Sequence, residues 1–388
     1  MKIPLKYNIR SLFVRKGTTF MTMFSIAFVV LVFIGVFSLG VGLEKAFRAS
    51  GDPDTLIVLR DGARSETESA QGMDVFRDIA TLPGIEIDAE GKPLASGEVI
   101  ILQIFERDDG SESNVVVRGV GDAAREVRPQ WSIVEGRDFE PGKGEIVVGR
   151  RLVGRFTGFE IGQSVTLGRM DFRIVGIFEA GEGSAESEVW GAIADIGDSF
   201  RRSNYVSSIR LRTTSAASAA TLTETIEGDQ RWRIAVKSEM QYYEEQSAAN
   251  TQQFKILGLL LAVLMGFGAC FAAANTMYAQ IANRGREIGT LRALGFKRGS
   301  ILTAFLLEAA FLGFFGGLVG VLLSLPLNGL KAGTTNFLTF SEITFELALT
   351  PPVLAGGVLL AVITGIVGGL PAAWAASRRQ ITGLLRET

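Results

Sequence analysis

Residues 283–298 have the sequence NRGREIGTLRALGFKR, a short basic segment between two long apolar runs. The runs, residues 256–279 and 301–325, are each long enough to cross the roughly 30 Å hydrocarbon core of a bilayer as a helix. The segment contains five cations and one anion, which indicates the cytoplasmic side of a membrane. We therefore predict a short cytoplasmic helix between two spans, ending near Gly295.

Composition allows two interpretations of this segment: a basic loop that only fixes topology, or a helix on which a cytoplasmic partner docks. Residues 286–320, REIGTLRALGFKRGSILTAFLLEAAFLGFFGGLVG, resemble the coupling segment and following helix of MacB/FtsX-type ABC-transporter permeases. The resemblance favours the docking helix. It implies a role in coupling to an ATPase for Arg284, Arg286, Glu287, Ile288, Leu291, Arg292, Leu294, Gly295 and Lys297.

Hydropathy predicts four membrane spans, at residues 18–43, 256–279, 301–327 and 351–375. A cleaved signal peptide is the alternative for the first run, but the run is too long and lacks a small-residue cleavage site. The flanking segments are a basic amphipathic helix at 1–17, the coupling helix at 280–300, a short outer segment at 328–350 and a basic tail at 376–388. Both termini are thus predicted to be cytoplasmic.

The polar region at 44–233 separates the first two spans and is predicted to be an extracytoplasmic domain. Residues 43–252 carry 24 cations and 36 anions, unlike the basic segments on the other side. Strand patterns alternate with a few helical ones, which indicates an α+β fold. The predicted strands are 55–59, 97–105, 114–120, 145–148, 164–167, 172–178 and 207–212, and the predicted helices are 74–82 and 216–226. The fold class is therefore a four-helix membrane protein with a large α+β extracytoplasmic domain inserted between helices 1 and 2.

Two further stretches resemble the same family. Residues 135–180 resemble the second half of its periplasmic domain, and residues 365–387 resemble its final helix and tail. The resemblance implies a first lobe from residues 54–120 and 195–233 and a second lobe from residues 128–194. Residues 179–188 are acidic and rich in Gly and Ser, which predicts a mobile loop. Residues 234–255 lack Gly and Pro and predict a helical stalk, paired with an extension of the first span.

Several chemistries are excluded by composition. The chain has no histidine, so Ser–His and Cys–His nucleophile pairs and His-ligated zinc are excluded. Its one cysteine, Cys270, lies in an apolar run and is interpreted as a packing residue. No G-x-x-x-x-G-K-[ST] motif occurs, so no cofactor is expected on this chain, and ATP-Mg is expected on a partner ATPase. The lack of a large basic surface argues against nucleic acid.

Glu308 and a row of glycines stand out in the third span. An acid inside a span is costly and faces the bundle, either as an ion site or as a structural hydrogen-bonding group, and the second interpretation is favoured. Gly313, Gly316, Gly317 and Gly320 include a G-x-x-x-G pair and predict close helix packing within the protomer or across a dimer. Simple tolerance of glycine in membrane helices is the alternative.

The predicted function is that of a permease subunit. The resemblance implies two permease copies, identical or paralogous, on a dimer of ATPase subunits in a bacterial inner membrane. MacB itself carries an N-terminal ATPase domain, whereas this chain starts close to its first span, so the ATPase is expected on another chain. ATP hydrolysis would drive motion of the extracytoplasmic domain, for efflux or for lipid or lipoprotein export. Some members of the family also use a periplasmic adaptor. The alternatives are an FtsX-like regulator of cell-wall hydrolases and an ATP-independent membrane receptor or scaffold.

Overall fold

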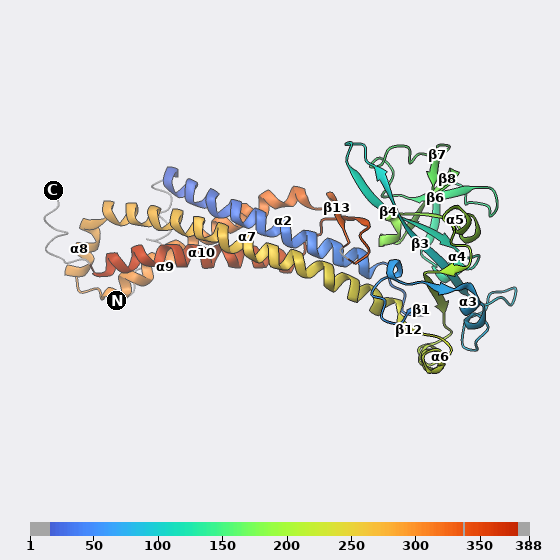
Figure 1. The fold of residues 1–388 in the computed structure, drawn as a ribbon. Helices are drawn as coiled ribbons and strands as arrows, with labels where there is room; N and C mark the ends of the chain where they lie inside the picture. The colour runs from blue at the N-terminus through green and yellow to red at the C-terminus, as the bar shows by residue number, and fades with distance from the viewer. Residues whose placement is uncertain (1–15, 337, 379–388) are drawn as a thin grey trace. The chain divides into compact units, whose positions relative to one another are not determined.

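The computed structural model describes residues 16–336 and 338–378 and divides the chain into two units (Figure 1). Unit 1 comprises Met1–Val41, Gln252–Leu330 and Leu347–Thr388, and unit 2 comprises Gly42–Thr251 and Lys331–Glu346. The helix predicted at residues 1–17 and the tail predicted at 376–388 lie largely outside the described residues.

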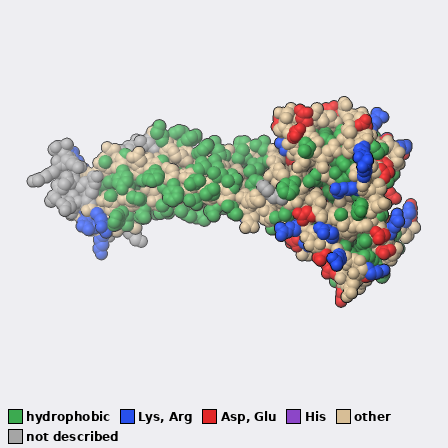
Figure 2. All heavy atoms as spheres, in the orientation of Figure 1, with side chains coloured by type: hydrophobic (Ala, Val, Ile, Leu, Met, Phe, Trp, Pro, Cys, Tyr) green, Lys and Arg blue, Asp and Glu red, His purple; other side chains and the backbone are tan. Residues whose placement is uncertain are grey.

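Unit 1 is helical. Among the described residues, four helices are long and apolar enough to cross a membrane, in agreement with the four predicted spans. They are α2 (Lys16–Arg48), α7 (Glu239–Asn283), α9 (Arg298–Ser324) and α10 (Pro351–Arg378). A short helix, α8 (Gly285–Ala293), follows α7, and a 3₁₀ turn, Leu325–Leu327, follows α9. Hydrophobic side chains cover most of the visible face of unit 1 (Figure 2).

Glycines of α9 allow the backbones of two other helices to approach closely. A Cβ atom added at Gly320 would lie 2.7 Å from Cβ of Val30 and 2.8 Å from the carbonyl oxygen of Ala27, both on α2. On the adjoining side, a Cβ added at Gly317 would lie 2.9 Å from Cβ of Ala361 on α10. Real Cβ atoms are not found at such distances, so α9 fits between α2 and α10 because these positions lack side chains.

The variant Gly320→Val is expected to destabilise unit 1 by about 1–3 kcal/mol, because its side chain must displace the α2 backbone. The measurement is the melting temperature of the detergent-solubilised protein. Gly266→Val on α7 is the matched control, since an added Cβ there meets no atom within 4 Å. Equal losses in both variants would contradict the packing described here.

Unit 2 is built on a ten-stranded mixed sheet with the order β12-β1-β11-β3-β4-β9-β6-β8-β5, in which β7 pairs with β8. Most neighbours are antiparallel, whereas β4 pairs with β9 and β6 pairs with β8 in parallel. The strands are β1 (Thr55–Arg60), β3 (Ala95–Glu106), β4 (Glu112–Val120), β5 (Trp131–Gly136), β6 (Glu145–Gly149), β7 (Ser164–Leu167), β8 (Met170–Ala180), β9 (Glu188–Ala192), β11 (Ser208–Arg212) and β12 (Ile234–Ser238). The sheet thus continues through both predicted lobes.

Short helices cover the apolar faces of this sheet. Helices α3 (Met73–Ile79) and α6 (Ala216–Gly228) pack on residues of β1 and β11, and α5 (Ile193–Ser199) packs beside β3, β4 and β6. The remaining small elements are η1 (Glu66–Glu68), α4 (Ala124–Val127), η2 (Ser184–Ser187) and the two-residue strands β2 (Gln71–Gly72) and β10 (Tyr205–Val206). The combination of sheet and helices agrees with the predicted mixed domain.

Two local predictions were wrong. The helix predicted from residue 234 begins only at Glu239, because residues 234–238 form β12 and pair with β1. The predicted loop at 179–188 begins within β8 and contains η2, and Ser184, Glu186 and Ser187 are buried. The Glu186 side chain accepts hydrogen bonds from the backbone N–H groups of Ala180 and Glu182 at 3.1 and 2.8 Å. This carboxylate therefore stabilises the local backbone.

The segment between α9 and α10 forms a hairpin that belongs to unit 2. Its strands are β13 (Lys331–Thr335) and β14 (Glu342–Glu346), paired antiparallel. The alternation of Ile343 and Phe345 indicates a strand, and both side chains are buried. The domain of unit 2 is therefore made from two parts of the chain rather than from one insertion.

Candidate functional site

Helix α8 is anchored to the ends of its neighbours in unit 1 by one apolar side chain. Ile288 is 2% exposed and packs in a cluster with Met277 and Ile281 of α7 and Phe305 of α9. Alanines near the end of α10 complete this cluster. Ile288 thus holds α8 against the ends of these helices through dense apolar packing.

The second anchor is a partly buried charge pair at the start of α8. The Arg284 guanidinium donates to a carboxylate oxygen of Glu308 on α9 at 3.1 Å and to Glu287 at 2.9 Å. It also lies 5.6 Å from the ring centroid of Phe305. Glu308, an acid inside a span, is thus ion-paired to Arg284.

The end of α8 is a glycine turn. Gly295 has φ +92°, a backbone conformation that favours glycine. Its N–H donates to the Arg292 carbonyl at 3.1 Å, and the Phe296 N–H donates to the Leu291 carbonyl at 3.1 Å. This pair of bonds is the Schellman arrangement, which satisfies the last carbonyls of a helix. The expected helix stop is therefore present, and it fixes where the chain leaves α8.

The structure separates the nine predicted coupling residues by exposure. Ile288 is buried, and three residues are half-buried: Arg284, Leu291 and Arg292. The exposed residues are Arg286, Glu287, Leu294, Gly295 and Lys297. Leu294 is 67% exposed, an apolar side chain beside basic ones. α8 thus has an inner side that contacts its own bundle and an outer surface of mixed charge and apolar character.

A second site lies in unit 2, where charged side chains gather on one face of the central strands. Arg210 of β11, Glu98 of β3 and Arg118 of β4 are all buried in the middle of apolar strands. Glu66 of η1 and Glu239 at the start of α7 approach the same face. We call these residues, with Glu188 of β9 and Arg128, the buried ion cluster.

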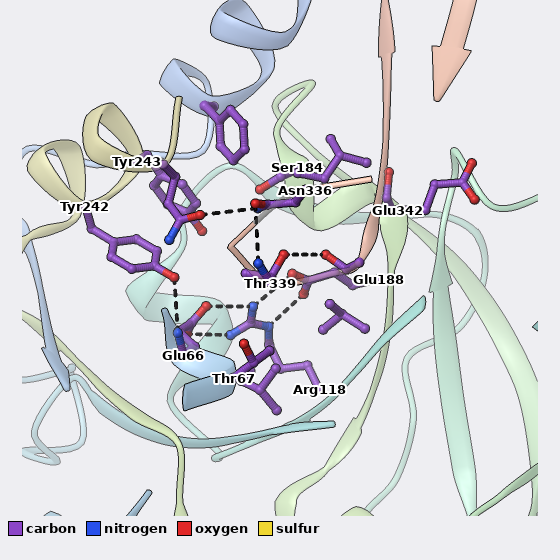
Figure 3. A pocket seen from close by; sticks show the side chains of 17 residues that line it. Glu66, Thr67, Arg118, Ser184, Glu188, Tyr242, Tyr243, Asn336, Thr339 and Glu342 are labelled. Atoms are coloured by element: carbon purple, nitrogen blue, oxygen red, sulfur yellow. Dashed lines mark hydrogen bonds and ion pairs between the residues drawn. The ribbon is translucent and has the colours of Figure 1, made fainter. Parts of the chain in front are cut away.

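Two arginines, Arg118 and Arg210, hold the buried ion cluster together, and Figure 3 shows Arg118 with Glu66 and Glu188. Arg118 binds both carboxylate oxygens of Glu188, at 2.7 and 2.8 Å, and also contacts Glu66 at 2.9 Å and Glu98 at 2.7 Å. Arg210 contacts Glu66 at 3.1 Å and Glu98 at 3.3 Å and forms an ion pair with Glu239. The planar guanidinium suits such forked contacts better than an ammonium group does.

These contacts keep the carboxylates charged despite their burial. Burial raises the pKa of Glu98, but Arg128, Arg210 and Arg118 outweigh it and lower the pKa to about 2. Burial likewise raises the pKa of Glu66, and Arg118 and Arg210 hold that pKa well below its usual range. Burial and the charge of Glu66 raise the pKa of Tyr242, so its phenol stays protonated and can form hydrogen bonds.

The lowered pKa of Glu98 predicts a loss of stability in acid. The unfolded chain protonates this glutamate near pH 4.5, whereas the folded chain does so near pH 2, so its contribution is present above pH 4.5 and is lost as the pH falls towards 2. We expect up to about 1.4 kcal/mol for each pH unit below 4.5. Melting temperatures between pH 7 and pH 3, followed by tryptophan fluorescence, measure it. Glu98→Gln should flatten this dependence, whereas Glu90→Gln, at an exposed ion pair, should leave it unchanged.

The buried ion cluster borders a small polar cavity of about 40 Å³. Glu66, Arg118, Glu188 and Tyr242 line it, and the Tyr242 hydroxyl accepts a hydrogen bond from the Glu66 backbone N–H at 3.3 Å (Figure 3). A cavity of this size and polarity has room for water. Among the described residues, no group of three or more His, Cys, Asp or Glu side chains could hold a metal ion.

Sequence reasoning did not select the buried ion cluster, although a signal exists for part of it. Arg118 follows three valines, Glu98 precedes an apolar run, and Arg210 lies between Ile209 and Leu211. A charge inside an apolar strand is rare unless it is paired. Glu66 carries no such signal, because its neighbours in the sequence are polar and only the fold brings it to the sheet.

Four apolar helices and a folded α/β domain define an integral membrane protein with a large soluble part. A model of the MacB-like periplasmic core domain matches residues 19–228, and a model of the FtsX-like permease C-terminal region matches residues 259–381. The chain therefore belongs to the MacB/FtsX-like family of ABC-transporter permeases. Family membership and the four helices indicate a bacterial inner-membrane protein.

Curated relatives include export proteins. The macrolide export ATP-binding/permease protein MacB of Sodalis glossinidius (strain morsitans) is 28% identical over 71% of this chain and 44% of its own length. The pyoverdine export ATP-binding/permease protein PvdT of Pseudomonas entomophila (strain L48) is 25% identical over 97% of this chain and 59% of its own length. The chain thus spans about half the length of these relatives.

Two solved structures each match about half of this chain. The periplasmic region of MacB from Actinobacillus actinomycetemcomitans matches with a TM-score of 0.37 and 10% identity, covering 51% of this chain and 94% of that one. The extracellular domain of the ABC-type transporter YknZ from Gram-positive bacteria matches with a TM-score of 0.36 and 13% identity, covering 47% of this chain and 99% of that one.

Proposed function

We propose that the chain is the membrane subunit of an ATP-driven export system and that its ATPase docks on the outer surface of α8. The observation that carries this proposal is the two-sided character of α8. Ile288 and Arg284 tie its inner side to α7 and α9, whereas Arg286, Leu294 and Lys297 are exposed. A docked partner that moves α8 would therefore move the ends of the spans. The cytoplasmic location of α8 and of both termini is part of this proposal.

α7 is the element that would carry this motion onward. It is one helix of 45 residues, about 68 Å long at 1.5 Å per residue, with its N-terminal turns in unit 2 and its C-terminal end next to α8. In this mechanism, ATP hydrolysis by the partner changes the conformation of the extracytoplasmic domain, and cargo does not pass through a polar channel. The ion pair between Glu308, an acid within the spans, and Arg284 supports a mechanism without a polar channel, because the charge of Glu308 is compensated.

The named export activities of the relatives support export over regulation of cell-wall hydrolases. We propose two copies of the permease chain with two ATPase subunits. The exposed apolar residues of α2 and α7, such as Phe24, Phe28, Leu260 and Phe267, would contact lipid or the second copy.

Purification from native membranes tests the proposal. The chain should co-purify with an ABC ATPase, and the complex should hydrolyse ATP faster than the ATPase alone. A chain that assembles in the membrane but binds no nucleotide-hydrolysing partner would favour the receptor or scaffold alternative. The composition of the complex also reports whether the two permease copies are identical.

A further inference from the structure

The N-terminal turns of α7 present a row of buried polar side chains in unit 2. Glu239, Tyr242, Gln246 and Asn250 follow one another at spacings of three or four residues and so share one side of the helix. None of them is more than 3% exposed. Helices that only rest on a domain present apolar side chains there, so a polar row on the buried side requires specific partners.

Each member of the row has a partner on another element. Glu239 pairs with Arg210 of β11, and its second oxygen accepts a hydrogen bond from the Asp52 backbone N–H at 3.1 Å. The Tyr242 hydroxyl accepts from the backbone N–H of Glu66. One turn further along α7, the Gln246 amide donates to the Arg64 carbonyl at 3.1 Å.

The last two members contact the hairpin between α9 and α10. Asn336 lies in the turn between β13 and β14 and is 3% exposed. Its amide nitrogen donates to the Gln246 side-chain oxygen at 3.3 Å, and its own oxygen accepts from the Asn250 amide at 3.0 Å. The hairpin, which follows α9 in the chain, is therefore hydrogen-bonded to α7.

The hairpin is also fastened to the sheet. Glu342 of β14 is 2% exposed and pairs with Arg107 at the end of β3 and with Arg155, the latter at 2.5 Å. The Arg151 guanidinium donates to the Thr344 carbonyl at 2.8 Å. α7, the hairpin and the sheet with its adjoining turns are thus joined pairwise by buried or partly buried polar contacts.

Buried polar contacts resist sliding, whereas apolar contacts tolerate it. If α7 shifted along its axis by one turn, Glu239 would leave Arg210, and the amides of Gln246 and Asn250 would leave Asn336. Each broken contact would leave a buried charge or hydrogen-bonding group without its partner, which is strongly unfavourable.

We propose that Glu239, Tyr242, Gln246 and Asn250, with Arg210 and Asn336, form a transmission contact that makes α7, the sheet and the hairpin move as one body. This inference rests on the proposed function, because it assigns the residues through which the motion of α7 reaches the domain. The hairpin takes part in that motion because Asn336 binds α7. These are positioning residues, and none of them is required to touch cargo.

The first test needs no ATPase. Hydrogen exchange of the full chain in detergent should show similar protection in residues 239–251 and 331–346. The double variant Gln246→Leu/Asn250→Leu leaves the hairpin sequence intact, yet it should raise exchange about tenfold in the hairpin as well as in α7. Glu244→Gln, an exposed change on the same helix, is the control and should alter neither segment. Exchange raised in α7 alone would overturn the proposed link to the hairpin.

The second test uses the complex with the ATPase. In a Cys270→Ala background, spin labels at Glu244 and Lys331, both exposed, report the distance between α7 and the hairpin. In the protein without the double variant, this distance should be the same in the nucleotide-free and ATP-bound states. In the double variant, the distribution of distances should broaden. If the distance changed with nucleotide in the protein that lacks the double variant, the proposed transmission contact would be wrong. Absence of any ATPase from the preparation would instead count against the proposed function, and the exchange experiment would still test the contact.

Discussion

The variant Arg286→Glu is expected to weaken association with the ATPase at least about 30-fold. Arg286 is exposed on α8, so reversing its charge leaves the fold of the chain intact and alters only the outer surface. A residue central to an interface contributes about 2 kcal/mol or more, which corresponds to that change in affinity. Titration of the purified ATPase onto the reconstituted chain measures the affinity, and ATP hydrolysis in the same samples measures the loss of stimulation.

Arg298→Glu is the matched control for this prediction. Arg298 is also exposed and basic, but it begins α9 and lies outside the predicted coupling residues. Both variants replace one arginine by glutamate on the same side of the membrane, so any general effect on topology affects them equally. Equal losses of affinity would therefore show that the charge acts through membrane topology and not through a contact of α8.

The variant Arg210→Met is expected to lower the stability of unit 2 by about 3–5 kcal/mol. Arg210 is fully buried and contacts Glu66, Glu98 and Glu239, so its removal leaves carboxylates with fewer compensating charges in a medium of low dielectric constant. For a domain of this size the loss corresponds to a fall of roughly 10 °C in melting temperature. Thermal unfolding followed by tryptophan fluorescence measures it.

Two comparison variants isolate the cause. Arg212→Met removes an arginine two residues away on the same strand, where the ion pairs to Asp52 and Glu86 are partly exposed, and it should cost about 1 kcal/mol or less. Arg210→Lys keeps the charge but loses the forked geometry, so its stability should lie between those of the other two. If Arg210→Met were as stable as Arg212→Met, the buried ion cluster would not hold unit 2 together.

The membrane part was predictable from sequence because its structure depends on residues that are close together in the chain. A run of more than twenty apolar residues has few stable arrangements other than a spanning helix, and Gly295 ends α8 through its own backbone conformation. Strands such as β7 and β8 were also predictable, because each is a short run rich in β-branched and other apolar residues. The docking role of α8 came from a family resemblance and is still a prediction.

The features that were not predicted depend on long-range contacts. β12 has a sequence compatible with a helix and becomes a strand because β1 offers it an open edge. The buried ion cluster brings together residues from η1, β3, β4, β9, β11 and α7, and periodicity does not reveal which charges meet. The partnership of Asn336 with Asn250 joins residues 86 positions apart, so only the folded structure shows the tie between the hairpin and α7.

Site-specific photo-crosslinking from α8 tests the central claim most directly. A photoreactive residue at Leu294, which is 67% exposed, should form an adduct with an ATP-binding protein in native membranes, and the yield should change when ATP is added. The same residue at Phe271, which is 74% exposed on the apolar surface of α7, should form no such adduct. A chain that assembles normally but gives no adduct with an ATP-binding protein from Leu294, or a Leu294 position labelled only by reagents added outside the cell, would contradict the account.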